Sequence, residues 1–214
     1  MFKEVPITKN MNWNRKPVLG VGINDADYKT IYEEDGKKYR CPFYIKWKDM
    51  IRRCYSEKIH KNRPTYEECS VCEEWLTFSN FKCWMEQQDW KGNHLDKDLK
   101  VKGNKVYSPD YCLFVSPLVN GLMHENKKTR GKYPLGVSFH KATNKFVVNI
   151  SLNGSSEYLG VFTCVNDAEL AYLKRKAEIV SLILHEQKNE LVKLALVEKI
   201  KEYELKIEEL KNGK

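Results

Sequence analysis

Residues 94–120, HLDKDLKVKGNKVYSPDYCLFVSPLVN, contain the strongest turn signal of the chain. The Gly103-Asn104 pair tolerates positive φ angles and is typical of a hairpin turn. Residues 99–102 and 105–107 flank this turn and have the composition of short strands. The segment therefore predicts a β-hairpin.

A helix start follows the predicted hairpin. Ser116 can cap the helix, and Pro117 suits its first turn because no hydrogen-bonding N–H group is needed there. Asn120 then lies about one turn into the helix and can face Asp96 on the first strand. Such oxygen ligands suit Mg²⁺ or another hard divalent cation with open positions for phosphate and water. The alternative is a carboxylate-rich surface hairpin that binds nothing.

This layout resembles the ββα-metal core of the HNH nuclease family, and most closely its phage-borne, homing-endonuclease-like branch. The segments YIKWKDMIRRCYSEK and CSVCEEWLTFSNFKCW also resemble that branch, so the resemblance covers residues 41–123. It implies that Asp96 and Asn120 hold one metal ion and that the protein cleaves or nicks duplex DNA.

The resemblance breaks at the residue after Asp96. That position normally holds the general-base histidine of the family, and here it holds Lys97. An ammonium group cannot accept a proton at neutral pH unless its pKa falls by several units, although it can neutralise a phosphate. The nearest histidine is His94, so His94 or an unassigned group would activate the water.

Net charge favours a polyanionic partner. The 214 residues include 37 Lys and Arg against 29 Asp and Glu, a net charge of +8, which makes double-stranded DNA the first candidate partner. The chain has no run of 18 apolar residues, and its first residues, MFKEVPITKN, lack the apolar segment of a signal peptide. We therefore expect a cytoplasmic protein without a membrane partner, in the host cytoplasm if it is phage-encoded.

The seven cysteines, without a secretion signal, favour reduced thiols or a metal site over disulfides. Four thiolates from three segments could bind one structural Zn²⁺. The alternative is that these thiols pack as small apolar groups, as we expect for the other three cysteines. The candidate zinc ligands are Cys54, Cys69, Cys72 and Cys112, and the packing cysteines are Cys41, Cys83 and Cys164.

Residues 43–57 predict a helix, because apolar side chains recur there at intervals of three and four. The other face of this helix is cationic and is either solvated or follows DNA phosphates. The apolar set is Tyr44, Trp47, Ile51 and Cys54, and the cationic set is Lys46, Lys48, Arg52 and Arg53. Residues 79–88 predict a second helix. Residues 1–40 predict a loose arm with short strands at 18–21 and 38–41.

Residues 134–182 predict three strands and a helix. The strands span residues 135–140, 145–152 and 157–162, and Asn166 or Asp167 is expected to cap the helix. The motifs GVSF, NKFVVNI and YLGVF and the Ala/Tyr-bearing helix resemble the Apetala-two-type DNA-binding domain of plant transcription factors and phage homing endonucleases.

The resemblance implies that one sheet face enters the major groove of DNA. The usual arginines of this face are mostly replaced here by Ser, His and Asn, so phosphate anchoring should be weaker. The alternative is a small solvated sheet without a ligand. The face carries Ser138, His140, Lys145, Asn149, Ser151, Ser156 and Tyr158.

Residues 183–214 predict a charged helical tail with an apolar stripe. The stripe either docks on its own domain or pairs with a second chain to form a homodimer. It consists of Leu196, Ile200, Tyr203, Ile207 and Leu210. Residues 124–133, HENKKTRGKY, predict a basic linker.

Together these features predict an α+β fold with an HNH-like domain at 41–123 and an Apetala-two-like domain at 134–182. The leading functional prediction is an endonuclease that uses one divalent cation. One alternative is an inactive module that binds DNA or a host protein and regulates or inhibits a host process. Another is a structural dimer organised by the tail. Lys97 favours the inactive module, whereas Asp96 and Asn120 favour the enzyme.

Overall fold

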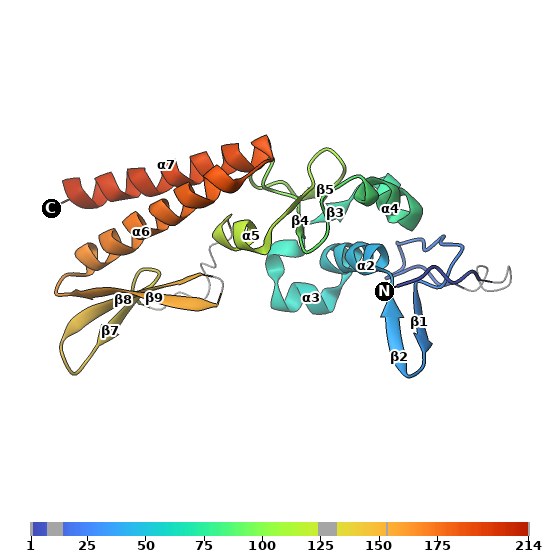
Figure 1. Ribbon diagram of the computed structural model, residues 1–214, viewed down its shortest axis with the longest axis horizontal. Helices are drawn as coiled ribbons and strands as arrows, with labels where there is room; N and C mark the ends of the chain where they lie inside the picture. The colour runs from blue at the N-terminus through green and yellow to red at the C-terminus, as the bar shows by residue number, and fades with distance from the viewer. Residues whose placement is uncertain (1, 8–14, 124–131, 153, 214) are drawn as a thin grey trace. The chain divides into compact units, whose positions relative to one another are not determined.

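The computed structural model describes residues 2–7, 15–123, 132–152 and 154–213 (Figure 1). Most of the predicted basic linker, residues 124–133, lies outside the described residues. The chain forms two compact units, Met1–Val115 and Ser116–Lys214. The division therefore falls at the start of the predicted helix, before the predicted linker.

The first unit combines short helices with two-stranded sheets. The predicted helices at residues 43–57 and 79–88 are present as α2 and α4. In chain order the elements are β1 (Ile31–Glu34), β2 (Lys37–Arg40), α2 (Pro42–Tyr55), α3 (Glu57–Asn62), the 3₁₀ turn η1 (Pro64–Tyr66), β3 (Ser70–Val71), the 3₁₀ turn η2 (Glu73–Leu76), α4 (Phe78–Glu86), β4 (His94–Asp96), β5 (Val106–Tyr107) and β6 (Leu113–Val115).

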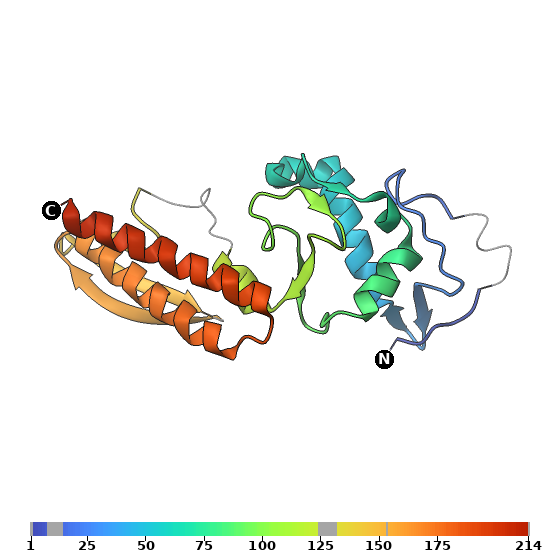
Figure 2. The same ribbon diagram turned by 90° about the horizontal axis from the view of Figure 1, so that it is seen from above.

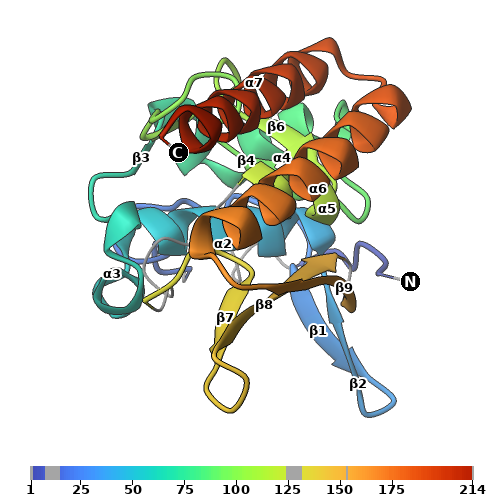
Figure 3. The same cartoon turned by 90° about the vertical axis from the view of Figure 1, so that its left-hand side faces the viewer.

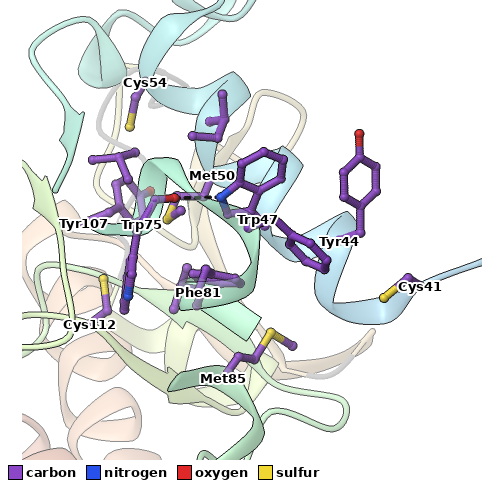
Figure 4. Close-up of a cluster of buried hydrophobic side chains, with 14 of the residues drawn as sticks. Cys41, Tyr44, Trp47, Met50, Cys54, Trp75, Phe81, Met85, Tyr107 and Cys112 are labelled. Carbon is purple, nitrogen blue, oxygen red and sulfur yellow. Dashed lines mark hydrogen bonds between the residues drawn. The ribbon is translucent and has the colours of Figure 1, made fainter. Parts of the chain in front are cut away.

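Aromatic side chains from α2, η2 and α4 form the core of the first unit (Figure 4). Trp47 is fully buried, and its indole Nε1 donates to the carbonyl oxygen of Trp75 at 2.7 Å. The Trp75 ring lies edge-on to Phe81, with ring centroids 5.1 Å apart. Because Trp47 and Trp75 are 28 residues apart, this contact fixes α2 against η2.

The N-terminal segment is not a loose arm beyond residue 15. Ala26 and Tyr28 are buried in the core of the first unit. Arg15 holds the segment in place, because its guanidinium donates to the carbonyl oxygens of Asn24, Ala26 and Tyr28 at 3.1, 2.6 and 2.9 Å. The expected strand at 38–41 is present as β2, which pairs with β1. Residues 18–22 instead form a turn closed by a bridge between Val18 and Gly22.

The hairpin predicted around Gly103-Asn104 is wrong in its strand pairing. β4 pairs antiparallel with β6, and β5 pairs parallel with β3. Residues 99–102 form no strand. The physical reason is local, since an oxygen of the Asp96 carboxylate accepts the backbone N–H groups of Asp98 and Leu99 and turns the chain away from the strand direction.

The second unit contains α5 (Pro117–Met123), a three-stranded antiparallel sheet and two long helices. The sheet order is β7 (Val137–His140), β8 (Lys145–Leu152) and β9 (Ser155–Phe162), and the helices are α6 (Val165–Glu186) and α7 (Glu190–Asn212). Figures 1 and 3 show α6 across one face of the sheet, and Figure 2 shows α7 running beside α6. The alternation predicted for β8 is confirmed, because Val148 and Ile150 are buried under α6.

The start of α6 differs from the prediction, and the packing of α7 decides between the two alternatives for its apolar stripe. α6 begins at Val165 after Cys164, which makes no side-chain capping bond, so the predicted cap at Asn166 or Asp167 is wrong. The tail stripe packs against α6, with Leu196 and Tyr203 fully buried. The stripe is therefore docked on its own domain. The overall class is α+β, and no helix within the described ranges is long and apolar enough to cross a membrane.

Candidate functional site

The candidate catalytic residues of the first unit lie on β4. His94 and Asp96 are two positions apart on this strand and so point to the same face, whereas Leu95 points to the other. Asp96 is only 4% exposed. Its Oδ1 accepts the N–H groups of Asp98 at 3.0 Å and Leu99 at 2.8 Å. These two hydrogen bonds fix the orientation of the carboxylate.

Lys97 is held by the loop that follows β4. Its side chain is 9% exposed, and its ammonium group donates to the carbonyl oxygen of Asn104 at 2.8 Å and to Oδ2 of Asp98 at 3.2 Å. The side-chain amide of Asn104 in turn donates to the carbonyl oxygens of Lys97 and Val106, each at 2.7 Å. Lys97 therefore acts as a structural anchor of this loop, a role that its position in the sequence did not predict.

His94 is exposed and has cationic neighbours from α2. Partial loss of solvent contact lowers the pKa of its imidazole, and the positive charges of Lys46 and Arg53 lower it further. Lys46 also donates to the carbonyl oxygen of Asn93, the residue before His94, at 2.7 Å. The site thus combines an exposed imidazole, a buried carboxylate and two cations.

The predicted cationic face of α2 divides into two parts. Lys46 and Arg53 lie near His94, whereas Arg52 pairs with Asp49 at 3.5 Å. Lys48 lies 5.8 Å from the ring centroid of Tyr44. Residue spacing alone could not separate these roles, because the position of β4 beside α2 is a tertiary contact.

Asn120, the predicted second metal ligand, is half-buried on α5. The start of this helix is confirmed, since Oγ of Ser116 accepts the N–H of Val119 at 3.2 Å and Pro117 is the first helical residue. Asp96 belongs to the first unit and Asn120 to the second. A shared metal site formed by Asp96 and Asn120 stays a prediction.

The four cysteines considered as zinc ligands are packed in the core of the first unit. Cys54, Cys69 and Cys112 are buried and Cys72 is half-buried. Burial raises the pKa values of Cys54 and Cys112 to about 12, so both are neutral thiols at physiological pH. Charges on Cys69 and Cys112 would raise the pKa of Cys54 further, so these thiols lie in one region of the core (Figure 4). In the described part of the chain, no three side chains of His, Cys, Asp or Glu gather into a group that could hold a metal ion.

The sheet of the second unit presents the predicted polar face. Strand register pairs Ser138 with Val147 and His140 with Lys145. On the other side of β8, Asn149 pairs with Tyr158 and Ser151 with Ser156. All seven predicted DNA-binding residues therefore share the face opposite the buried Val148 and Ile150.

A β-bulge in β9 keeps Tyr158 and Ser156 on this face. Val148 pairs with Gly160 and Asn149 with Tyr158, so Leu159 is an extra residue on β9. Gly160 adopts a φ of +132°, which favours glycine. Tyr158 is 61% exposed, and the exposed Val161 lies on the same face opposite Val147. Val161 was not among the predicted face residues, because its direction depends on the strand register.

The nearby arginine of α6 is committed to internal contacts. Arg175 forms a two-pronged pair with the Glu157 carboxylate at 3.0 and 3.1 Å and contacts Glu178 at 3.0 Å. Glu157 pairs with Ile150, so it lies on the helix side of the sheet. Arg175 therefore ties α6 to β9, and Lys145 is left as the cation of the polar face.

Comparisons with protein-family models, curated proteins and solved structures found no match to this chain.

Proposed function

We propose that this protein is a DNA-binding endonuclease of the HNH type that cuts or nicks duplex DNA with one divalent metal ion. The observation that carries the proposal is the shared face of β4, where the exposed imidazole of His94 lies two residues from the buried carboxylate of Asp96. The cations Lys46 and Arg53 near His94 add positive charge where a phosphodiester would lie.

Asp96 would hold the metal ion, and Asn120 stays the second ligand that the HNH resemblance implies. The fit of Asp96 rests on its two backbone N–H donors, which orient the carboxylate. A bound Mg²⁺ would supply Lewis-acid stabilisation of the charge that develops on the phosphate. A pair of one carboxylate and one amide leaves coordination positions for water and phosphate oxygens, as hard divalent ions require.

His94 is the better candidate for the general base than Lys97. The Lys97 side chain is buried, and its ammonium group is a donor to the half-buried residues Asp98 and Asn104. The His94 ring is exposed, and it makes no hydrogen bond with another described residue, so a water molecule can approach it. In this assignment Lys97 anchors the loop, and His94 accepts the proton of the attacking water.

The sheet of the second unit would supply duplex binding. Its polar face has the inward and outward alternation that a major-groove reader needs, with side chains projecting from three adjacent strands. The exposed Tyr158 and the amide of Asn149 lie opposite each other near its middle. The face has few cations, so most of the non-specific attraction would come from the basic chain as a whole.

A nicking assay on supercoiled plasmid with Mg²⁺, with Mn²⁺ and with EDTA tests the proposal. We expect metal-dependent relaxation by the native protein and its loss in Asp96→Ala and His94→Ala. Asp89→Ala is the matched control, because Asp89 is an exposed acid in the segment before β4. Nicking that persists in Asp96→Ala or in EDTA would refute the metal assignment.

The second candidate is an inactive HNH-like module that binds DNA or a host protein and regulates or inhibits a host process. The role of Lys97 favours it, since the usual base position is occupied by a structural side chain. Duplex binding without nicking under any metal condition would select this module over the enzyme.

A further inference from the structure

One stripe of α2 faces the start of β4. Lys46, Asp49 and Arg53 follow a spacing of three and four residues and so lie on one side of the helix. The Lys46 ammonium donates to the carbonyl oxygen of Asn93 at 2.7 Å and lies 6.0 Å from the ring centroid of Phe114, which pairs with Leu95 of β4. Lys46 is therefore held beside His94.

Arg53 is packed among aromatic residues instead of carboxylates. Its guanidinium carbon lies 5.8 Å from the ring centroid of Tyr66, and the side chain also interacts with the phenol of Tyr107. Tyr107 is fully buried, so one end of Arg53 is fixed within the core. A guanidinium group has five N–H donors, and these contacts do not use all of them.

The charges of Lys46 and Arg53 are not balanced by an ion pair within the described residues of the first unit. Asp49, the acid of the stripe, lies 3.5 Å from Arg52, and its charge offsets those of Lys46 and Arg53 only in part and without a direct ion pair. Burial lowers the pKa of the Lys46 ammonium group, and the charge of Arg53 lowers it further. Two partly desolvated cations on one side of a helix, whose charges act on each other, form a favourable place for an anion.

We propose that Lys46 and Arg53 form a binding site for one phosphodiester group of a nucleic-acid backbone, which they present to His94. The ligand class rests on the proposed function. The two non-bridging oxygens of a phosphodiester can accept N–H groups from a guanidinium and an ammonium together. Arg53 would bind through its planar edge, and Lys46 would act as a point charge. These are contacts to the backbone, so they carry no base preference.

The test is the binding of a fluorescent duplex by the full chain in EDTA, where cleavage cannot contribute. Lys46→Met removes the charge but keeps most of the stem over Phe114. The loss of one phosphate contact should reduce the fold change in Kd between 50 and 200 mM salt by about 3.5-fold. Lys46→Arg should restore the native salt dependence. Lys48→Met, on the same helix but away from His94, is the matched control and should leave it unchanged.

Arg53→Gln should reduce the salt dependence in the same way, provided that its circular dichroism spectrum matches that of the native protein. Native salt dependence in a folded Lys46→Met variant, or an equal loss in Lys48→Met, would overturn the proposal. A titration with inorganic phosphate at constant ionic strength, followed by NMR, forms a second arm. If phosphate perturbs the native protein but not Lys46→Met, while duplex binding is the same in both, the site takes free phosphate and the nucleic-acid assignment is wrong.

Binding and nicking separate this inference from the proposed function. Lys46-dependent binding in a protein that never nicks plasmid supports the phosphate site and refutes the nuclease. Nicking that is unaffected by Lys46→Met supports the nuclease and refutes the site.

Discussion

The side chains of Lys97 and Asn104 each donate a hydrogen bond to the backbone carbonyl oxygen of the other residue. The Lys97 ammonium group donates to the carbonyl oxygen of Asn104 at 2.8 Å, and the Asn104 amide donates to the carbonyl oxygen of Lys97 at 2.7 Å. The two residues close the loop between β4 and β5. This reciprocal pair gives the lysine beside Asp96 a structural role in closing the loop.

The pair should behave as one stabilising unit. Asn104→Ala removes the donor to the carbonyl oxygens of Lys97 and Val106, and Lys97→Met removes the donor to that of Asn104. Because these groups are partly buried, each change should lower the free energy of unfolding by about 1–3 kcal/mol. Their double variant should lose less than the sum of the two, with a coupling energy of about 0.5–3 kcal/mol. Urea unfolding at pH 7 measures the free energy of unfolding of the two single variants and the double variant. Additive losses would contradict the reciprocal arrangement.

Gly136 should not tolerate a side chain. A Cβ atom at this position would overlap the Tyr172 ring and come within 2.6 Å of the carbonyl oxygen of Asn149, and the φ angle is +77°. Gly136→Ala should therefore destabilise the second unit by about 2–4 kcal/mol. Gly154→Ala has a similar φ of +79° but no atom within 4 Å, so its cost should be about 1 kcal/mol. Equal melting temperatures for the two variants would refute the close packing of Tyr172.

The indole of Trp47 should contribute a specific bond as well as apolar area. Trp47→Phe keeps an aromatic ring but removes the donor to the carbonyl oxygen of Trp75, so we expect a loss of about 2–4 kcal/mol. Trp90→Phe is the control, because Trp90 is only partly buried against Phe43. Its loss should stay below about 1 kcal/mol. Thermal unfolding followed by circular dichroism distinguishes the two.

The polar face of the sheet should carry base discrimination. Asn149→Ala should weaken binding to a selected duplex by about 1–3 kcal/mol and binding to random duplexes much less. Lys145→Ala should weaken both about equally, because a phosphate contact carries no base information. Lys193→Ala is the control for the loss of one positive charge, because Lys193 lies on α7 and pairs with Glu190. Anisotropy measurements in which Asn149 and Lys145 variants bind like the native protein would refute this face.

The buried thiols should make stability sensitive to alkaline pH. Burial raises the pKa values of Cys54 and Cys112 to about 12, whereas an unfolded cysteine ionises near 9. The unfolded state therefore loses protons first, so each thiol lowers stability as pH rises from about 9 to 12, by about 1.4 kcal/mol per pH unit. Denaturant titrations should show a shallower decline in Cys54→Ala. A decline as steep as in the native protein would contradict the raised pKa.

The same thiols should resist chemical modification in the folded protein. At pH 8 a disulfide reagent should react first with the exposed Cys83, and Cys54 and Cys112 should react only after unfolding. Peptide mapping after brief labelling identifies the modified residues. Early labelling of Cys54 would show that the core of the first unit opens readily.

Several parts of the structure could be predicted because their signals are local. The helix α2 follows from the spacing of Trp47 and Ile51, and the start of α5 follows from Ser116 and Pro117. The alternation along β8 predicted which side of the sheet is buried. Periodicity and capping depend on a few neighbouring residues, so the sequence alone contains them.

The partners of these elements were decided by tertiary structure. Turn composition around Gly103-Asn104 predicted a hairpin, but β4 pairs with β6 because the Asp96 carboxylate turns the chain out of the strand. The fully buried Trp47 is bonded to a carbonyl 28 residues away, which no periodicity indicates.

In the candidate site, too, some features follow from the sequence and others only from tertiary contacts. The sequence by itself singled out Asp96 with the nearby His94 and predicted that the α2 helix carries cations opposite its apolar side. The shared strand face of His94 and Asp96 on β4 came from the structure. Only the tertiary structure placed Lys46 and Arg53 near His94, and only it gave Lys97 a hydrogen-bond partner in Asn104. The reason is physical: local preferences set the conformation of a segment, whereas burial and hydrogen-bond satisfaction between distant segments decide which side chains meet.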